Sequence, residues 1–312
     1  MAETTLLPAP REAAPSTRIL AGAPESVELA AERLRLGGLV AFPTETVYGL
    51  GADGLRPDAV RKIYAAKGRP QDHPLILHVN GLPMARALAA RWTETAQRLV
   101  EAYWPGPLTL VLPASPLVPE EVRGGGPTVA LRMPAHRLAL ALIRRLDRPV
   151  AAPSANRHQG VSPTTAADVA SELGASVDLI LDGGLCEQGV ESTVVDLSGD
   201  RPRILRPGPI TSAMLRGWAE APEGATVAAG PRPSPGLAPR HYAPRMPLVL
   251  SADPEAEAFR RRAAGLRVAR LARGRVAELH RDGDRWVLPN HPAAFARGLY
   301  AARHAIQASD PD

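Results

Sequence analysis

Residues 41–54 read AFPTETVYGLGADG, and the pattern that begins there sets the architecture of the chain. The apolar run 39–42 is typical of a short buried strand. Pro43 ends this strand, because proline lacks the N–H that a strand ladder needs. Three glycines follow, at Gly49, Gly51 and Gly54. Glycine permits turns and close backbone approaches that a side chain would block, so the stretch predicts a buried strand followed by a polar turn.

The next segment reads as a helix, a basic loop and a second strand, ending in KGRPQDHPLILH at residues 67–78. Pro57 suits the first turn of the helix, and Gly68 suits its end. Lys67 and Arg69 flank that end. Two cations near a hydroxyl-rich turn could form an anion pocket. The alternative is a solvated helix end, where the negative pole of the helix favours cations. These residues alone leave both interpretations open.

Along the whole chain, strands and helices alternate, while hairpin-like neighbouring strands also occur. This order predicts an α/β fold in which a twisted mixed sheet carries flanking helices. A region rich in proline, glycine and arginine interrupts the pattern and reads as a linker. We therefore expect a disordered tail over 1–17, a main domain over 18–220, a proline-rich linker over 221–247 and a small α/β domain over 248–312.

Composition narrows the class of protein. The chain has 312 residues, of which 45% are hydrophobic and 22% charged, as in globular proteins. No apolar run approaches the ~20 residues of a membrane span, and the N-terminus lacks the apolar core of a secretory signal. The single cysteine, Cys186, excludes an internal disulfide and a cysteine-based zinc site. We expect a cytoplasmic protein without membrane contact.

The net charge of +5 suits an anionic partner, either a nucleotide or, weakly bound, RNA. An arginine-rich and alanine-rich composition can produce the same charge without any such partner. No GxxxxGKS loop is present, so a nucleotide would not be held in the P-loop manner. No Ser/His/Asp arrangement and no motif around Cys186 indicates a protein nucleophile.

Several motifs occur in a fixed order between about residues 20 and 245. They are PTETVYGLGADG (43–54), KGRPQDHPLILHV (67–79), LRMPAH (131–136), APSAN (152–156), ESTVVDLSG (191–199), ILRPGPIT (204–211) and PSPGLAPRHYAP (233–244). In this order the chain resembles the YrdC-like threonylcarbamoyl-AMP synthases in their two-domain form. Several motifs in register are far more specific than one short motif.

The resemblance implies an L-threonylcarbamoyladenylate synthase, which is a nucleotidyltransferase. It would join ATP, L-threonine and bicarbonate, release pyrophosphate, and supply the tRNA machinery that makes N6-threonylcarbamoyladenosine. It also implies a basic concave cavity on a YrdC-like sheet, and Mg²⁺ accompanying ATP. Two-domain members usually continue beyond the last helix of this chain with another strand and helix, so we expect either an abbreviated C-terminal domain or a truncated sequence.

The resemblance also assigns roles to individual residues. The catalytic set is Lys67, Arg69, Ser154 and Asn156. The threonine-binding set is Thr46, His78, Arg132, Ala152 and Ser192. The ATP-binding set is Arg69, His73, Thr128, Ser154, Ser162, Arg206 and Tyr242. No metal ligands are implied. A guanidinium such as that of Arg132 suits a carboxylate, because it can donate two parallel hydrogen bonds.

Each assignment has a simpler alternative. Thr46 and Ser162 are also typical of local turn hydrogen bonds. His78 could be a core histidine, and Tyr242 could belong to a plain tether instead of a lid over the nucleotide. For the chain as a whole, the alternatives are a carbamoyltransferase-type adenylating relative and a non-catalytic RNA-binding protein. Aromatic residues are only 4% of the chain, which disfavours an RNA-stacking surface.

The proposed catalytic set yields a direct test. Lys67→Ala and Arg69→Ala should each lower turnover by roughly 10- to 150-fold, since hydrogen bonds to charged groups contribute about 1.5–3 kcal/mol. Steady-state rates of pyrophosphate release measure the effect. Turnover near that of the parent chain in both variants would remove the two residues from the site.

Overall fold

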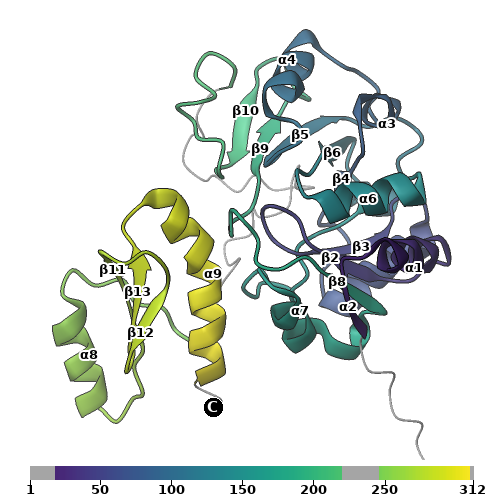
Figure 1. The fold of residues 1–312 in the computed structure, drawn as a ribbon. Helices are drawn as coiled ribbons and strands as arrows, with labels where there is room; N and C mark the ends of the chain where they lie inside the picture. Colours follow the sequence, from purple (N-terminus) through teal and green to yellow (C-terminus); the bar gives the residue numbers. More distant parts are fainter. Residues whose placement is uncertain (1–17, 220–245, 310–312) are drawn as a thin grey trace, which may run out of the picture.

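The structure is a computed structural model, and it describes residues 18–219 and 246–309. The larger part of the chain forms a ten-stranded mixed sheet with helices on both faces, as expected (Figure 1). Its strands are β1 (Arg18–Ala21), β2 (Val40–Phe42), β3 (Gly49–Asp53), β4 (Ile76–His78), β5 (Leu108–Pro113), β6 (Thr128–Arg132), β7 (Val150–Ala151), β8 (Leu179–Asp182), β9 (Thr193–Asp196) and β10 (Arg203–Arg206).

The strand order is β1-β8-β2-β3-β7-β4-β6-β5-β9-β10. The sheet contains parallel pairs, such as β4 with β6 and β5 with β9, and antiparallel pairs, such as β3 with β7. The helices of this part are α1 (Pro24–Arg35), α2 (Pro57–Lys67), α3 (Leu82–Leu88), α4 (Glu94–Tyr103), α5 (Glu120–Arg123), α6 (Arg137–Leu146) and α7 (Ala166–Leu173), followed by a 3₁₀ turn over Gly174–Ser176.

The first predicted strand shows why the sheet is covered on both faces. β2 is buried throughout, and successive side chains of a strand point to opposite faces. Val40 and Phe42 pack in a cluster with α1 and α6, whereas Ala41 belongs to the larger cluster that includes α2, α4 and α7. A strand that is apolar on both faces is typical of a sheet between two helical layers.

The helix predicted after this strand has the expected ends. α2 begins at Pro57 and stops at Gly68, which adopts the left-handed conformation with φ 63°. The glycines before it act by close approach. A Cβ added to Gly54 would lie 2.8 Å from the carbonyl oxygen of Pro149, and one on Gly51 would lie 2.9 Å from Val150 Cγ1. Strands β3 and β7 therefore lie side by side because glycine leaves the space between them.

Two loops that carry predicted site residues interlock where β3 meets β7. Gly49 forms an isolated antiparallel bridge with Ser154. The N–H of Leu50 donates to Pro153 O at 2.8 Å, and the N–H of Ala155 donates to Tyr48 O at 2.8 Å. The turn after β2 and the loop after β7 are thus fixed to each other by backbone hydrogen bonds.

The C-terminal part forms a separate small α/β unit. It contains α8 (Pro254–Ala263), β11 (Arg270–Gly274), β12 (His280–Asp282), β13 (Arg285–Pro289) and α9 (Pro292–Ser309), with strand order β11-β13-β12. Figure 1 shows α9 between this small sheet and the larger part of the molecule. Tyr300 and Leu299 of α9 pack against Val47 and Val161 of the larger part.

Some predictions fall on other parts of the chain. The tail over 1–17, nearly all of the linker over 221–247, and Tyr242 with its lid role lie outside the described residues. The predicted domain boundaries remain predictions. In residues 18–219 and 246–309, no helix combines the length and apolar character needed to cross a membrane.

The close approach at Gly54 predicts a stability effect. Gly54→Ala should lower the free energy of unfolding by about 1–3 kcal/mol, because the added methyl overpacks the β3–β7 contact. Chemical denaturation measures the change. Gly199→Ala is the matched control, since an added Cβ there meets no atom within 4 Å. Equal unfolding midpoints for the two variants would contradict the packing argument.

Candidate active site

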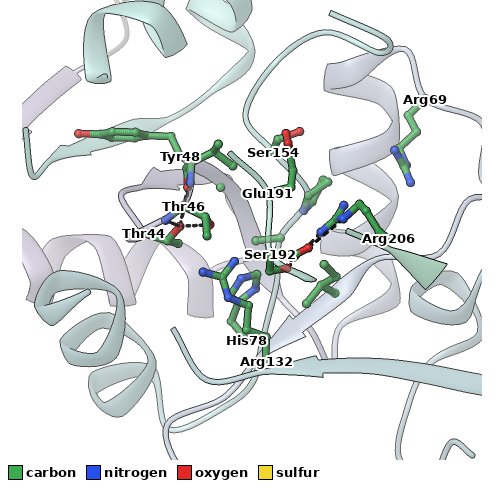
Figure 2. Close-up of a pocket in the computed structure, with 15 residues that line it drawn as sticks. Thr44, Thr46, Tyr48, Arg69, His78, Arg132, Ser154, Glu191, Ser192 and Arg206 are labelled. Carbon is green, nitrogen blue, oxygen red and sulfur yellow. Dashed lines mark hydrogen bonds between the residues drawn. The ribbon is translucent and has the colours of Figure 1, made fainter. Parts of the chain in front are cut away.

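A cavity opens where the turn after β2, the loop after β7, and strands β4, β6, β9 and β10 meet (Figure 2). It encloses about 500 Å³, a figure that includes space open to solvent. The lining residues are Thr44, Thr46, Val47, Tyr48, Gly49, Arg69, Ile76, His78, Arg132, Ala152, Pro153, Ser154, Glu191, Ser192 and Arg206. Eight of the residues that the resemblance assigns to the site thus share one cavity: Thr46, Arg69, His78, Arg132, Ala152, Ser154, Ser192 and Arg206.

The hydroxyl-rich turn presents a hydrogen-bond acceptor to this cavity. The Thr44 hydroxyl donates to Val47 O at 2.7 Å, and the two threonine hydroxyl oxygens, Thr44 Oγ1 and Thr46 Oγ1, lie 2.8 Å apart. Since a hydroxyl has one proton, Thr46 is the donor in that pair. The remaining lone pairs of Thr46 Oγ1 can accept a hydrogen bond from a ligand. The local hydrogen bond to backbone that was the alternative for Thr46 is made by Thr44, and the Thr46 hydroxyl bonds to the Thr44 hydroxyl.

Arg132, at the end of β6, is fixed by a buried carboxylate. Its Nη2 donates to Glu45 Oε1 at 2.6 Å, and Glu45 Oε2 accepts from the N–H of Ala135 at 3.1 Å. The Nε of Arg132 donates to Gly106 O at 3.3 Å. The arginine side chain is 5% exposed, so its guanidinium is both desolvated and oriented. Nη1 has no hydrogen-bond partner among the described residues, and this edge suits an anionic ligand.

His78, at the end of β4, is neutral in this environment. It is 3% exposed and lies edge-on to the ring of Phe42. Burial, assisted by the positive charge of Arg132, lowers the pKa of His78 to about 3. Its buried Nδ1 has no hydrogen-bond partner in the described structure. A buried polar atom without a partner is unfavourable unless a ligand or water satisfies it, which favours a binding role over a core role.

Ser192 and Arg206 form a third group at the β9–β10 side. Arg206 Nη2 donates to Ser192 Oγ at 3.1 Å, and its Nε donates to Ser192 O at 3.0 Å. Ser192 Oγ also lies 2.8 Å from Thr109 Oγ1. Arg206 is 8% exposed, so this cation too is largely removed from water. In Figure 2, Ser192 lies between Arg206 and the Thr44–Thr46 turn.

The Lys67 side chain contributes to the site by binding backbone carbonyl groups of the loop after β7. Its amine donates to the carbonyl oxygens of Ser154 and Asn156, and the Lys67 carbonyl accepts from the N–H of His158 at 2.8 Å. Burial, with a smaller contribution from Arg69, lowers the pKa of Lys67 well below its ordinary value. Lys67 is not among the residues that line the cavity. It holds the loop that carries Ser154.

The Asn156 side chain also points into this loop. Its Nδ2 donates to Arg157 O at 2.6 Å and Gly160 O at 2.9 Å, and its Oδ1 is buried without a partner among the described residues. His73 lies outside the cavity lining, with its ring 5.4 Å from that of His158. Thr128 opens β6 and Ser162 donates its hydroxyl to Glu191 Oε1, and neither lines the cavity.

The burial of Lys67 and Arg69 decides between the two interpretations of the basic loop. They are 4% and 7% exposed, so the solvated helix end is wrong. Arg69 faces the cavity that the hydroxyl-rich turn also lines. Arg69 thus lies where the pocket interpretation puts it, whereas the Lys67 amine points to the loop carbonyls, and anion binding stays a prediction.

Three further residues belong to the candidate site and were not predicted from the sequence: Glu45, Tyr48 and Glu191. Glu45 and Glu191 stand beside quoted motif residues, at TET (44–46) and EST (191–193). A glutamate beside residues that are predicted to bind an anion indicates that its carboxylate could pair with a cation of the site. The Tyr48 ring points away from the cavity (Figure 2), and its hydroxyl donates to Gly184 O at 2.9 Å. This hydrogen bond joins residues 136 positions apart in the sequence, so no local sequence pattern predicts it.

Comparison with known proteins identifies the family to which the chain belongs. The Sua5–YciO–YrdC family model, described as "Telomere recombination", matches residues 32–208. The chain belongs to the Sua5–YciO–YrdC family. A second family model, "Threonylcarbamoyl-AMP synthase, C-terminal domain", matches residues 210–309. The family resemblance given by the motifs is thus confirmed for both parts of the chain.

Individual members of the family are also similar. The chain is 45% identical over 234 residues to a threonylcarbamoyl-AMP synthase of Pyrococcus abyssi, covering 73% of this chain and 68% of that protein. It is 47% identical over 225 residues to one of Bacillus subtilis, covering 71% and 65%. The structure of P. abyssi Sua5 complexed with L-threonine matches with a TM-score of 0.82 and 38% identity, over 93% of this chain and 89% of that one. The matched sequence spans about two thirds of the two curated relatives.

The buried, neutral His78 predicts a pH effect on stability. An unfolded histidine has a pKa near 6.5, whereas folded His78 has a pKa of about 3. Between these values only the unfolded chain takes up the proton, so stability falls as the pH falls below about 6.5. From pH 6.5 to 5.5 this group should remove about 1 kcal/mol from the free energy of unfolding.

Urea unfolding at pH 7.5, 6.5 and 5.5 measures this effect in the parent chain and in His78→Gln. The glutamine variant keeps a polar side chain that does not titrate, so its loss of stability over the same range should be smaller by about 1 kcal/mol. Parallel stability profiles would contradict a neutral, buried His78.

Proposed function

We propose that the chain is an L-threonylcarbamoyladenylate synthase, and thus a nucleotidyltransferase. One observation carries the proposal: three largely buried arginines, Arg69, Arg132 and Arg206, line a single cavity together with threonine and serine hydroxyls. The family membership and the likeness to a P. abyssi protein solved with L-threonine support it.

The chemistry explains why such a cavity is needed. The amino nitrogen of L-threonine takes up the carbon of bicarbonate, with loss of water, and becomes a carbamate. A carbamate oxygen then bonds to the α-phosphorus of ATP as the bond to the bridging oxygen breaks and pyrophosphate leaves. A doubly negative carbamate must therefore approach a polyanion. Two like charges 4 Å apart repel by about 4 kcal/mol at an effective dielectric constant near 20.

The arginines supply the compensating charge. Arginine stays protonated even when buried, whereas the pKa of Lys67 is lowered. We assign Arg132 to the threonine carboxylate, because its Nη1 edge is open and Glu45 fixes the rest of the guanidinium. Arg69 and Arg206 are assigned to the phosphates. Charges held in place before the substrates arrive need no reorganisation during the reaction.

The hydroxyl and backbone groups then orient the substrates. Thr46, His78, Ala152 and Ser192 line the threonine end, and Ser154 lines the ATP end at the loop that Lys67 holds. His73, Thr128 and Ser162 do not line the cavity, so their proposed contacts with ATP need parts of the nucleotide that extend beyond it. Asn156, proposed as a catalytic residue, does not line the cavity either. Tyr242 remains a proposed ATP contact.

Mg²⁺ is proposed to arrive with ATP. Among the residues that the structure describes, no group of three or more His, Cys, Asp or Glu side chains could hold a metal ion. Mg²⁺ commonly keeps several waters and binds substrate phosphates instead of a protein cage. When bound there it would neutralise part of the phosphate charge. The chain's own residues supply the remaining positive charge.

The product would pass to the machinery that transfers the threonylcarbamoyl group to tRNA, and this role implies a cytoplasmic location. A carbamoyltransferase-type adenylating relative would need no L-threonine. An RNA-binding protein without catalysis would release no pyrophosphate. Both alternatives are therefore separated from the synthase by one assay.

The decisive assay is pyrophosphate release from ATP and Mg²⁺, with L-threonine or bicarbonate omitted in turn. Release should require both, and L-serine should be a poor substitute, because one methyl group contributes only about 1–3 kcal/mol. Release that persists without L-threonine would contradict the proposal.

A pair of variants on β10 connects the assay to the cavity. Arg206→Met should lower the rate by roughly tenfold or more, because it removes a buried cation from the wall. Arg203→Met is the matched control, since Arg203 is 62% exposed and pairs with Asp196. Equal rates in the two variants would remove Arg206 from the site.

A further inference from the structure

The C-terminal unit makes a direct contact with the wall of the cavity. Tyr300 of α9 is 5% exposed, and its hydroxyl donates to Glu191 Oε2 at 2.8 Å. Ser162 donates its hydroxyl to the other oxygen, Glu191 Oε1. Both oxygens of this carboxylate are thus held by hydroxyl groups. Among the described residues that line the cavity, Glu191 is the only carboxylate.

Other contacts seat α9 against the same wall. Tyr300 packs with Val47, which lines the cavity, and with Val161. His304, one turn further along α9, places Nε2 3.0 Å from Ser162 O. A Cβ added to Gly189 would lie 2.6 Å from the Cα of Arg297, so the loop before Glu191 fits against the helix backbone. The interface therefore includes Glu191 itself, the loop before it at Gly189, and Val161 and Ser162.

The charge of Glu191 indicates which substrate this arrangement serves. The other charged side chains that line the cavity are the arginines Arg69, Arg132 and Arg206. These suit carboxylate and phosphate groups. L-threonine also brings an ammonium group before it becomes a carbamate, and a carboxylate is its natural partner. Glu191 is adjacent in sequence to Ser192, at the end of the cavity assigned to threonine.

We propose that Tyr300 is a positioning residue of the active site, which fixes the Glu191 carboxylate so that it favours the ammonium group of L-threonine. The C-terminal unit therefore completes the threonine end of the cavity. This inference rests on the proposed function. It assigns to α9 a part in substrate affinity in addition to any part in folding.

The test compares the parent chain with Tyr300→Phe, Glu191→Gln and the double variant. Phenylalanine keeps the packing against Val47 and removes only the hydroxyl. Tyr300→Phe should raise the KM for L-threonine about 3- to 10-fold, with changes of less than about twofold in kcat and in the KM for ATP. In the Glu191→Gln background the same change should have little further effect, because the two residues act as one unit.

Tyr103→Phe is the matched control, since its hydroxyl donates to Met214 O at 3.2 Å and it does not line the cavity.

An unchanged KM for L-threonine in Tyr300→Phe would overturn the inference. Equal effects of Tyr300→Phe with and without Glu191→Gln would also overturn it. So would equal losses of affinity for both substrates together with a lower melting temperature.

Calorimetric titration with L-threonine separates this inference from the proposed function. If the parent chain binds L-threonine but releases no pyrophosphate, the proposed function fails, and a 3- to 10-fold weaker affinity in Tyr300→Phe would still support the inference. If the parent chain does not bind L-threonine, both fail.

Discussion

The hydrogen bonds from the Lys67 amine to the carbonyl oxygens of Ser154 and Asn156 are the constraint on which the site depends. They connect the end of α2 to the loop after β7, and that loop is in turn bridged to Gly49 beside the hydroxyl-rich turn. Three segments that are distant in sequence therefore share one rigid junction. In this geometry the Lys67 amine shapes the wall of the cavity, and its direct action on the substrates stays a prediction. Loss of this amine would leave both carbonyl groups without this donor, and an unsatisfied buried group such as that of Asn156 costs about 1–3 kcal/mol.

The site also holds positive and negative side chains at separate places in one cavity. The positive charge of the cavity comes from arginines that remain protonated when buried, each fixed by its own partner: Glu45 for Arg132, Ser192 for Arg206 and the carbonyl of Pro74 for Arg69. The single carboxylate that lines the described wall, Glu191, is held by hydroxyl groups that do not neutralise it. The cavity can therefore present opposite charges at different points, as a zwitterionic amino acid and a polyanionic nucleotide require.

Much of the fold follows from local patterns in the sequence. The doubly buried strand at residues 40–42, the helix between Pro57 and Gly68, and the mixed sheet all reflect apolar runs and helix-end residues whose effects act over a few positions. The common cavity of eight proposed site residues could be anticipated only from the family motifs, because spacing alone does not bring Arg69 and Arg206 together. The direction of the Lys67 side chain, the Glu45 counter-charge and the contact of Tyr300 with Glu191 could not be anticipated. Each depends on long-range packing between segments that have no shared local pattern.

In the proposed reaction, one cavity brings a threonine-derived carbamate to the α-phosphate of ATP. The most direct measurement is mass spectrometry of the products formed by the purified chain from ATP, L-threonine and ¹³C-labelled bicarbonate in the presence of Mg²⁺. The structure predicts an adenylate that contains L-threonine and one labelled carbon, formed in equal amount to pyrophosphate. An adenylate without threonine, or ATP hydrolysis to ADP or AMP with no labelled product, would contradict the account.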